Sequence, residues 1–305
     1  MKRYVAGLDG GGTKTAVTVA DENGLVVHTF TSGAINYNGQ DEVSIRHSFQ
    51  EIFDTVARVC GGLDHCAQVV IGAAGLSNPT VIARLESNVR ESGYQGELFI
   101  IGDQETALCG AHDSEYGIIL IAGTGSICYG KNEYGLSHRT GGYGHLIDDE
   151  GSGYSIGRDL LSALVQANDG RLPETIITDM VYEQLQLSSV QQIIGFVYDK
   201  RTNKKDIAAL APILSDACER GDKVALTIAK KSALSLFEIV VPVVEKLSLQ
   251  KGSLAMAGSV LLKNSFVQSA FVDMLKKGYP DLHCIIAKND ASSGAVLMAL
   301  NRLKD

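Results

Sequence analysis

The chain has 305 residues, 45% of them hydrophobic, with a net charge of −8 and a pI of about 5.4. This charge argues against nucleic acid or an anionic membrane as a partner, and no apolar run approaches the ~20 residues of a membrane span. Six scattered cysteines, and an N-terminus without the apolar region of a signal peptide, favour a cytoplasmic protein with free thiols.

The first predicted element is a strand that ends in Asp9 and the glycines Gly10, Gly11 and Gly12, and the β-branched run 16–20 continues as a second strand. Consecutive glycines have no side chains and permit φ > 0, so their N–H groups can converge on an anion. A Walker A loop or a dinucleotide fingerprint would need a helix after the glycines. The segment therefore predicts a phosphate-binding hairpin with a carboxylate beside it for a hydrated metal ion. An ordinary glycine-rich turn is the competing interpretation.

The first half continues as strands that alternate with helices. Asn78-Pro79 has the form of an N-cap followed by proline at the first helical position. Asp103 stands at the carboxyl end of an apolar strand. The other predicted elements are strands over 25–30, 68–72 and 97–102, a polar loop over 31–39, and helices over 41–60, 79–92 and 104–112.

The pattern of the opening hairpin returns in the second half of the chain. A strand over 118–122 leads into the turn Gly123-Thr124-Gly125-Ser126, and a strand over 127–130 follows. This internal repeat predicts two related domains that bind phosphates from both sides. A loop that is rich in glycine and acidic residues follows over 141–153.

The remaining chain is helical from 154 to 247 and then alternates again. Helix breaks are predicted near 169–170, 187–189, 202–203 and 221–222, and the helix over 222–247 is expected in the core or a dimer interface. A strand over 253–257, a turn at Gly258-Ser259, a strand over 283–287 and a helix over 290–303 complete the chain.

Length and element order together predict the domain organisation. At roughly 150 residues per domain, the chain has room for two domains, and the element order predicts an α/β fold with mixed sheets. We place the domains at 1–114 and 115–305, with the terminal helix 290–305 packing back on the first domain.

Three segments occur in the order found in the actin-like ATPase superfamily of sugar kinases, heat-shock ATPases and actin: Asp9 to Thr13, Gly123 to Ser126, and Gly258-Ser259. The loop from Gly142 through Asp149-Glu150-Gly151-Ser152 resembles more closely the N-acetylglucosamine kinase branch of the BadF/BadG/BcrA/BcrD ATPase family. The resemblance covers nearly the whole chain. It implies two ribonuclease-H-like domains that face each other across a cleft, with ATP and Mg²⁺ as cofactors.

The resemblance also implies a role for each matching residue. Asp103 is the implied catalytic carboxylate, and Asp9 is implied to hold Mg²⁺ through water. The implied sugar-binding residues are Asn36, Tyr37, Asp103, Gly142, Tyr143 and Asp149. The implied ATP-binding residues are Gly10, Gly11, Gly12, Thr13, Lys14, Thr124, Gly125, Gly258 and Ser259.

Chemistry supports Asp103 independently, because a carboxylate must accept or orient the proton of a sugar hydroxyl that attacks phosphorus. Ligands also gather at the carboxyl ends of strands in α/β sheets. Several alternatives stay open: a helix N-cap role for Asp103, a turn role for Asn36, and Glu150 in place of Asp149 as the sugar ligand. His145 is interpreted as structural.

Two departures from the family pattern lie beside the implied sugar site. Tyr143 stands where relatives commonly have tryptophan, and Asp148 stands where they commonly have glycine. The sugar therefore stays open among N-acetylglucosamine, N-acetylmuramic acid and glucosamine. Side chains alternate between the two faces of the strand that follows Thr13, so it also stays open whether Lys14 faces the phosphates.

The predicted function is ATP-dependent transfer of phosphate to the 6-hydroxyl of an N-acetylated amino sugar, by a homodimer. A glucosamine kinase is the first alternative. An activator ATPase of an acyl-CoA reductase or dehydratase is the second, and it would need cysteines such as Cys60 and Cys66 to share an iron–sulfur cluster between subunits. A sugar-sensing regulator is the third, but the chain lacks the Cys-rich zinc motif of that group.

Overall fold

The chain folds into two compact units in the computed structural model, which describes residues 3–37, 40–76 and 78–304. Unit 1 comprises Met1–Tyr116 and Ala287–Asp305, and unit 2 comprises Gly117–Ile286. The last part of the chain thus returns to unit 1. Within the described ranges, no helix is both long enough and apolar enough to cross a membrane.

Unit 1 is built on a five-stranded mixed sheet with the strand order β3-β2-β1-β4-β5. Its strands are β1 (Tyr4–Gly10), β2 (Lys14–Asp21), β3 (Val26–Gly33), β4 (Cys66–Ala73) and β5 (Glu97–Gly102). The first three are antiparallel, whereas β4 and β5 run parallel to β1. The predicted strands are confirmed, but β3 continues to Gly33 through residues that we predicted as loop.

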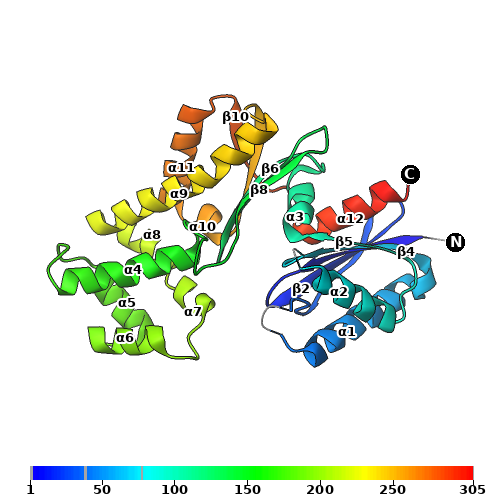
Figure 1. Cartoon of the computed structure of the whole chain (residues 1–305), viewed down its shortest axis with the longest axis horizontal. Coiled ribbons are helices and arrows are strands. Elements are labelled where there is room, and N and C mark those ends of the chain that lie inside the picture. Colours follow the sequence, from blue (N-terminus) through cyan, green and yellow to red (C-terminus); the bar gives the residue numbers. More distant parts are fainter. Residues whose placement is uncertain (1–2, 38–39, 77, 305) are drawn as a thin grey trace. The chain divides into compact units, whose positions relative to one another are not determined.

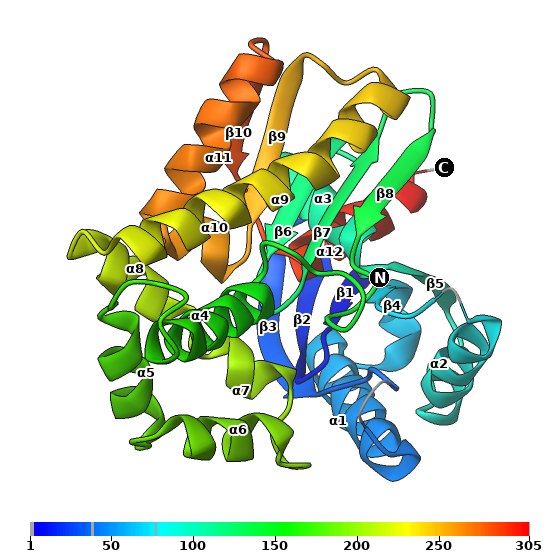
Figure 2. The same ribbon diagram turned by 60° about the vertical axis from the view of Figure 1, so that its left-hand side comes forward.

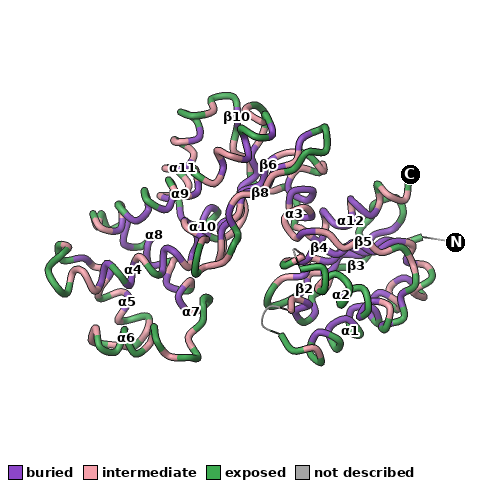
Figure 3. The backbone as a smooth tube through the Cα atoms, viewed as in Figure 1, coloured by how far each residue is buried: buried purple, intermediate pink, exposed green. Residues whose placement is uncertain are grey.

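Helices cover both faces of this sheet, as Figure 1 shows. One face carries α1 (Glu42–Cys60) and α2 (Pro79–Glu91), and the other carries α3 (Asp103–His112) and α12 (Ala291–Arg302). A short 3-10 turn, η1 (Leu63–His65), precedes β4. Because side chains alternate along a strand, Leu8 packs in the core with α1 while Val5 packs with α12. Strand β1 is buried along most of its length, and so is β4, as Figure 3 shows.

Unit 2 repeats this strand arrangement. Its sheet has the order β10-β9-β6-β7-β8, which is the order of unit 1 when read from the other edge. The strands are β6 (Gly117–Ala122), β7 (Ser126–Lys131), β8 (Ser137–Gly141), β9 (Gly252–Ala257) and β10 (Leu282–Ile286). The predicted internal repeat is therefore confirmed at the level of the fold.

The four predicted helix breaks of unit 2 are confirmed, but a further break over 209–211 was not predicted. They are α4 (Gly153–Asn168), α5 (Ile177–Leu185), α6 (Val190–Tyr198), α7 (Lys204–Ala208), α8 (Pro212–Glu219), α9 (Lys223–Leu247), α10 (Ser259–Lys263) and α11 (Ser265–Gly278). Helix α9 crosses one face of the unit 2 sheet (Figure 2). Its N-cap is Asp222, whose side chain accepts the Ala225 N–H.

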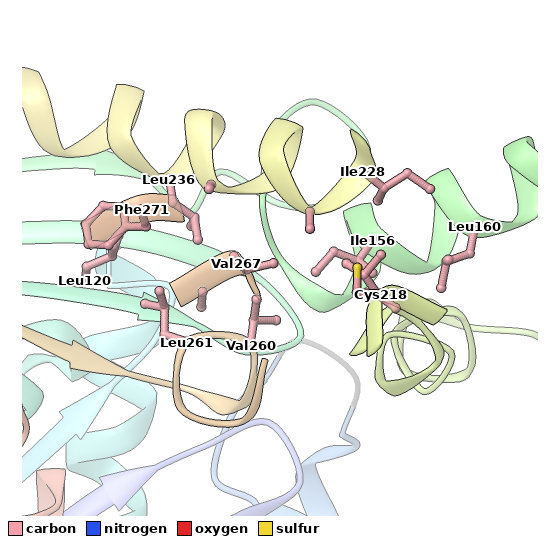
Figure 4. Close-up of a cluster of buried hydrophobic side chains, with 14 of the residues drawn as sticks. Leu120, Ile156, Leu160, Cys218, Ile228, Leu236, Val260, Leu261, Val267 and Phe271 are labelled. Atoms are coloured by element: carbon pink, nitrogen blue, oxygen red, sulfur yellow. The ribbon is translucent and has the colours of Figure 1, made fainter. Parts of the chain in front are cut away.

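Helix α9 supplies much of the unit 2 core. Its Ile228 and Leu236 pack in one cluster with Leu160 of α4 and Phe271 of α11 (Figure 4). Burying an aliphatic or aromatic side chain contributes about 1.5–3 kcal/mol. The predicted core role of this helix is confirmed, and it packs directly against α4.

Candidate functional site

The ends of β1 and β5 bring Asp9 and Asp103 to one edge of the unit 1 sheet. Asp9 is paired with Gly72, and Ala73 with Gly102, so these strands end side by side. Burial first, and then the carboxylates of Asp103 and Asp290, raise the pKa of Asp9 to about 6, while Lys14 acts in the opposite direction. The carboxylates of Asp9, Asp103 and Asp290 therefore form a group whose members act on one another electrostatically.

Asp290 is a member of this group that sequence analysis missed. It caps α12, and its Oδ1 accepts hydrogen bonds from the Ser293 N–H at 2.8 Å and from Ser292 Oγ at 2.9 Å. Burial alone would raise the pKa of Asp290, but these hydrogen bonds outweigh burial and hold it below its ordinary value. Ser292 Oγ also lies 2.8 Å from Thr18 Oγ1, in a buried contact that fixes the start of α12 against β2.

Asp103 is the first residue of α3, and the N-cap is Gly102. The Gly102 N–H donates to Glu105 Oε1 at 3.3 Å, and the Gln104 N–H donates to Asp103 Oδ1 at 2.9 Å. The alternative in which Asp103 is the N-cap is therefore wrong. Its carboxylate is half-buried at the strand-to-helix junction, where ligands of α/β sheets gather.

The first glycine hairpin differs from our expectation in its backbone. Gly10, Gly11 and Gly12 have no positive φ angle. Gly10 is required for packing instead, because a Cβ atom there would lie 2.9 Å from the Ile35 side chain. The Gly11 N–H donates to the Asp9 carbonyl at 3.1 Å and closes the turn. The tip from Gly12 to Lys14 is exposed, so a ligand can approach its backbone.

The polar loop after β3 fixes Tyr37 against α2. Tyr37 Oη accepts a hydrogen bond from Asn88 Nδ2 at 2.8 Å, and the Arg84 guanidinium lies 3.9 Å from the centre of its ring. Burial first, and then the Glu42 carboxylate, raise the pKa of Tyr37. Asn36 is half-buried beside it. The tyrosine thus positions the loop that carries Asn36.

The second glycine turn is held by backbone contacts within unit 2. The Gly123 N–H donates to the Gly125 carbonyl at 2.9 Å, and the Gly153 N–H at the start of α4 donates to the Gly123 carbonyl at 2.7 Å. Gly258, before α10, has a φ of 87°, and a Cβ atom there would lie 2.3 Å from the Ala122 carbonyl oxygen. The predicted turn residues Thr124 and Ser259 therefore lie close to each other at the ends of β6 and β9.

A cavity of about 490 Å³ opens in unit 2 at this place. Thr124 and Ser259, both predicted from the sequence, are among its lining residues. Sequence analysis missed its other polar residues, which come from α7, α8 and the end of α10: Lys205, Ser215, Asp216, Glu219, Lys263 and Asn264. The spacing of Asp216 and Glu219, three apart on α8, is a signal that they share a helix face.

Asn264 is the most informative of these residues. It is only 5% exposed, and its Oδ1 caps α11 by accepting the Val267 N–H at 3.0 Å. Its Nδ2 is buried and has no hydrogen-bond partner among the described residues. A buried donor without a partner costs about 1–3 kcal/mol. A ligand with an acceptor atom in this cavity would remove that cost.

Asp149 lies against the second glycine turn. It is 5% exposed, has a φ of 64°, and its Oδ1 accepts the Ser126 N–H at 3.4 Å. Burial raises its pKa, and the Ser126 hydrogen bond partly offsets this effect. A Cβ atom on Gly125 would lie 2.9 Å from Asp149 Oδ2. The acidic loop and the second glycine turn are therefore packed together.

The neighbouring Glu150 is held by α4 instead. Its carboxylate accepts hydrogen bonds from Ser155 Oγ at 2.7 Å and from Arg158 Nη2 at 2.7 and 2.9 Å. Burial would raise the pKa of Glu150, but these contacts outweigh burial and lower it. This engagement favours Asp149 over Glu150 as the ligand residue of the loop.

The start of the acidic loop exposes an aromatic ring. Tyr143 is 60% exposed, and its N–H donates to Asp148 Oδ2 at 3.1 Å. Gly142 before it has a φ of 73°. The His145 ring packs edge-on against Tyr154 at 4.7 Å, in agreement with a structural role.

The cysteine pair does not have the placement that an activator ATPase needs. Cys60 is 5% exposed and Cys66 is 1% exposed, both within the unit 1 core. Thiols at such positions cannot reach a cluster shared with another subunit. No group of three or more potential metal ligands occurs in the ranges 3–37, 40–76 and 78–304.

Comparison with known proteins places the chain among sugar kinases. It is 36% identical to the N-acetylmuramic acid/N-acetylglucosamine kinase of Clostridium acetobutylicum, covering 97% of this chain and 98% of the relative. It is 30% identical to the N-acetyl-D-glucosamine kinase of Dictyostelium discoideum, over 99% of both chains. A candidate N-acetylglucosamine kinase from Chromobacterium violaceum has a similar solved structure, with a TM-score of 0.76, 25% identity, and 98% and 99% of the two chains covered.

The sequence profile that matches this chain spans nearly its whole length. It covers residues 6–299, and therefore includes both glycine turns, Asp103 and the acidic loop. The full-length similarity to amino-sugar kinases and the two repeated mixed sheets agree with this match. The chain therefore belongs to the BadF/BadG/BcrA/BcrD ATPase family.

Proposed function

We propose that this protein is a kinase that transfers the γ-phosphoryl group of ATP to the 6-hydroxyl of an N-acetylated amino sugar, giving the sugar 6-phosphate and ADP. The substrate class follows from the relatives, which cover the whole chain at 36% and 30% identity. We further propose that the protein acts as a homodimer.

The observation that carries the chemistry is the position of Asp103 beside Asp9 at the end of the unit 1 sheet. A sugar hydroxyl is a weak nucleophile, and a carboxylate that accepts its proton accelerates the transfer about 10²- to 10⁴-fold. Asp103 is the residue for this role, because its backbone is fixed at the start of α3 while its carboxylate stays half-buried. The sugar itself is bound by Asn36, Tyr37, Gly142, Tyr143 and Asp149.

The phosphates are bound by the two glycine turns. Unit 1 contributes the exposed tip with Gly10, Gly11, Gly12, Thr13 and Lys14, and unit 2 contributes Thr124 and Gly125. Lys14 acts on Asp9 electrostatically, which places its charge at the same end of the hairpin. A cation there offsets phosphate charge.

Asp9 is the residue that would hold Mg²⁺, through water. The carboxylates of Asp9, Asp103 and Asp290 fit this ion. Burial first, and then repulsion from the other two carboxylates, raise the pKa of Asp9 to about 6, and a nearby cation favours its charged form. Mg²⁺ commonly keeps several waters and is held by one or two carboxylates together with substrate phosphates. When bound, it would neutralise charge on the transferring phosphoryl group.

The cavity in unit 2 holds the nucleoside. Gly258 places Ser259 at its wall, and Asn264 offers a buried N–H donor for an acceptor atom of the purine. The carboxylates of Asp216 and Glu219 are acceptors that suit the ribose hydroxyls. These roles give the chain's own residues a complete set of contacts for ATP.

One experiment tests the proposed function directly. The full chain is incubated with ATP, Mg²⁺ and a panel of N-acetylglucosamine, N-acetylmuramic acid, glucosamine and glucose, with ADP release as the readout. NMR of the product identifies the phosphorylated position. Turnover of an N-acetylated sugar at the 6-hydroxyl is the expected result. Preference for glucosamine, or ADP release that no sugar stimulates, would refute the proposal.

A further inference from the structure

Arg139 lies on the exposed aromatic ring of the acidic loop. The residue belongs to β8, and its guanidinium carbon is 4.4 Å from the centre of the Tyr143 ring. The backbone of Tyr143 is fixed because its N–H donates to Asp148 Oδ2 at 3.1 Å. A cation–π contact of this kind uses the face of the guanidinium and leaves its N–H groups directed outward in the plane.

Arg139 forms no ion pair with any carboxylate in the part of the chain that the structure describes. Arg158 differs, since it is bound to Glu150 at 2.7 Å. Arg139 is also half-buried, so its charge is partly removed from water, with the Tyr143 ring as its neighbour.

The surroundings of Arg139 are otherwise acidic. Asp148, Asp149 and Glu150 are consecutive in the loop, and the whole chain carries a net charge of −8. A neutral amino sugar needs no cation beside such a loop. An anionic sugar would be repelled by it unless a cation faced the anionic group.

The two acceptors in the name of the Clostridium acetobutylicum relative differ in this respect. N-acetylmuramic acid carries a carboxylate on a lactyl ether, whereas N-acetylglucosamine has a free hydroxyl at that position. We propose that Arg139, stacked on Tyr143, binds the carboxylate of an acidic N-acetylated amino sugar and so extends the acceptor range from N-acetylglucosamine to N-acetylmuramic acid. This inference rests on the proposed function.

The guanidinium of Arg139 and the carboxylate of the sugar are chemically suited to bind each other. The planar guanidinium donates two parallel hydrogen bonds to one carboxylate, which a lysine ammonium cannot do. The contact with the Tyr143 ring restrains the guanidinium before the sugar arrives, so less conformational entropy is lost on binding. The rest of the sugar makes the same contacts in both substrates. The contact that differs between the two sugars is the one between Arg139 and the lactyl carboxylate.

The test compares the two sugars in one protein. Steady-state kinetics of the full chain with saturating ATP and Mg²⁺ give KM for each sugar in wild type, Arg139→Ala and Arg139→Lys. Because a hydrogen bond to a charged group is comparatively strong, we expect Arg139→Ala to raise KM for N-acetylmuramic acid about tenfold to a hundredfold more than KM for N-acetylglucosamine. Arg139→Lys keeps the positive charge but cannot donate two parallel hydrogen bonds to the carboxylate. We expect its effect on KM for N-acetylmuramic acid to lie between those of wild type and Arg139→Ala.

Two further variants test whether the selective loss is specific to Arg139. Arg171→Ala removes an exposed arginine that pairs with Asp169 at 2.6 Å, outside the proposed site, and we expect it to leave the ratio of the two KM values unchanged. Lys204 is the competing cation, because its charge acts on Asp149. If Lys204→Ala rather than Arg139→Ala produced the selective loss, the assignment to Arg139 would be wrong.

Three other outcomes would contradict the proposed role of Arg139. Equal losses for both sugars in Arg139→Ala would mean that Arg139 only supports the loop. A wild-type protein that phosphorylates N-acetylglucosamine but not N-acetylmuramic acid would overturn the inference and leave the proposed function intact. A wild-type protein that phosphorylates neither sugar would overturn both.

Discussion

The backbone of Gly258 lies directly against that of Ala122, since a Cβ atom on Gly258 would be 2.3 Å from the Ala122 carbonyl oxygen. Gly258 also has a φ of 87°, which side-chain-bearing residues rarely adopt. This contact fixes the start of α10 at the end of β6. It thereby sets the position of Ser259 at the unit 2 cavity.

We expect Gly258→Ala to destabilise unit 2 and to raise KM for ATP, because the backbone must move to accept the methyl group. The backbone conformation of Gly258, with φ 87° and ψ 154°, alone costs a residue with a side chain about 1–3 kcal/mol, and the steric contact adds to it. Gly170→Ala is the matched control, with a φ of 82° and nothing within 4 Å of the added carbon. Thermal unfolding and ATP kinetics of both variants make the comparison. Equal unfolding temperatures together with an unchanged KM for ATP would contradict the role given to Gly258.

Asp103→Asn should reduce kcat about 10²- to 10⁴-fold, because the amide cannot accept the hydroxyl proton. ATP affinity, measured by calorimetry, should change little, since Asp103 is assigned to the sugar. Asp64→Asn, at a side chain that is 84% exposed, controls for loss of a unit 1 carboxylate. Near-normal turnover in Asp103→Asn would remove Asp103 from the catalytic role.

Asp9→Asn should stabilise the ligand-free protein at high pH. The pKa of Asp9 is about 6 in the folded chain, compared with 3.8 for an ordinary aspartate. The folded state therefore holds a proton that the unfolded state has lost, so the contribution of Asp9 to stability is present at low pH and lost as pH rises through 6. We expect the variant to raise the Tm by about 2–4 °C at pH 8. At pH 4 the two proteins should melt together, and a difference that is the same at both pH values would show that ionisation of Asp9 is not its cause.

Asn264 variants should separate the cap of α11 from nucleotide binding. Asn264→Ser keeps a side-chain acceptor for the Val267 N–H but removes the Nδ2 donor. Because one hydrogen bond contributes about 0.5–1.5 kcal/mol, we expect KM for ATP to rise about two- to tenfold with little change in Tm. Asn264→Ala should lower both ATP affinity and Tm. If ATP affinity fell only when Tm fell, Asn264 would be a helix cap and not a ligand residue.

Features encoded within a few residues could be predicted from the sequence. Asn78 caps α2 ahead of Pro79, as the sequence indicated, and its side chain accepts the Thr80 N–H. The glycine turns and the strand end at Asp103 were likewise recognisable, because each depends on local residue types. The strands on both sides of each turn were predicted for the same reason.

Features created by the tertiary fold could not be predicted. Asp290 joins Asp9 only because α12 packs across β1, and Asn264 lines a cavity whose other walls come from α7 and α8. The extension of β3 was missed because Ser32 is polar, yet it is buried with its hydroxyl bonded to Glu51 Oε2 at 2.6 Å. No local pattern signals a partner that lies in another element.

The position of α12 also has a consequence for folding during synthesis. Unit 2 is continuous from Gly117 to Ile286, whereas unit 1 is completed only by the segment that begins at Ala287. On the ribosome, the face of the first sheet with Val5 and Val70 is therefore covered by α3 but still lacks α12 while all of unit 2 emerges. Unit 2 can thus complete its fold before unit 1, and this apolar face depends on protection from aggregation until α12 has been synthesised.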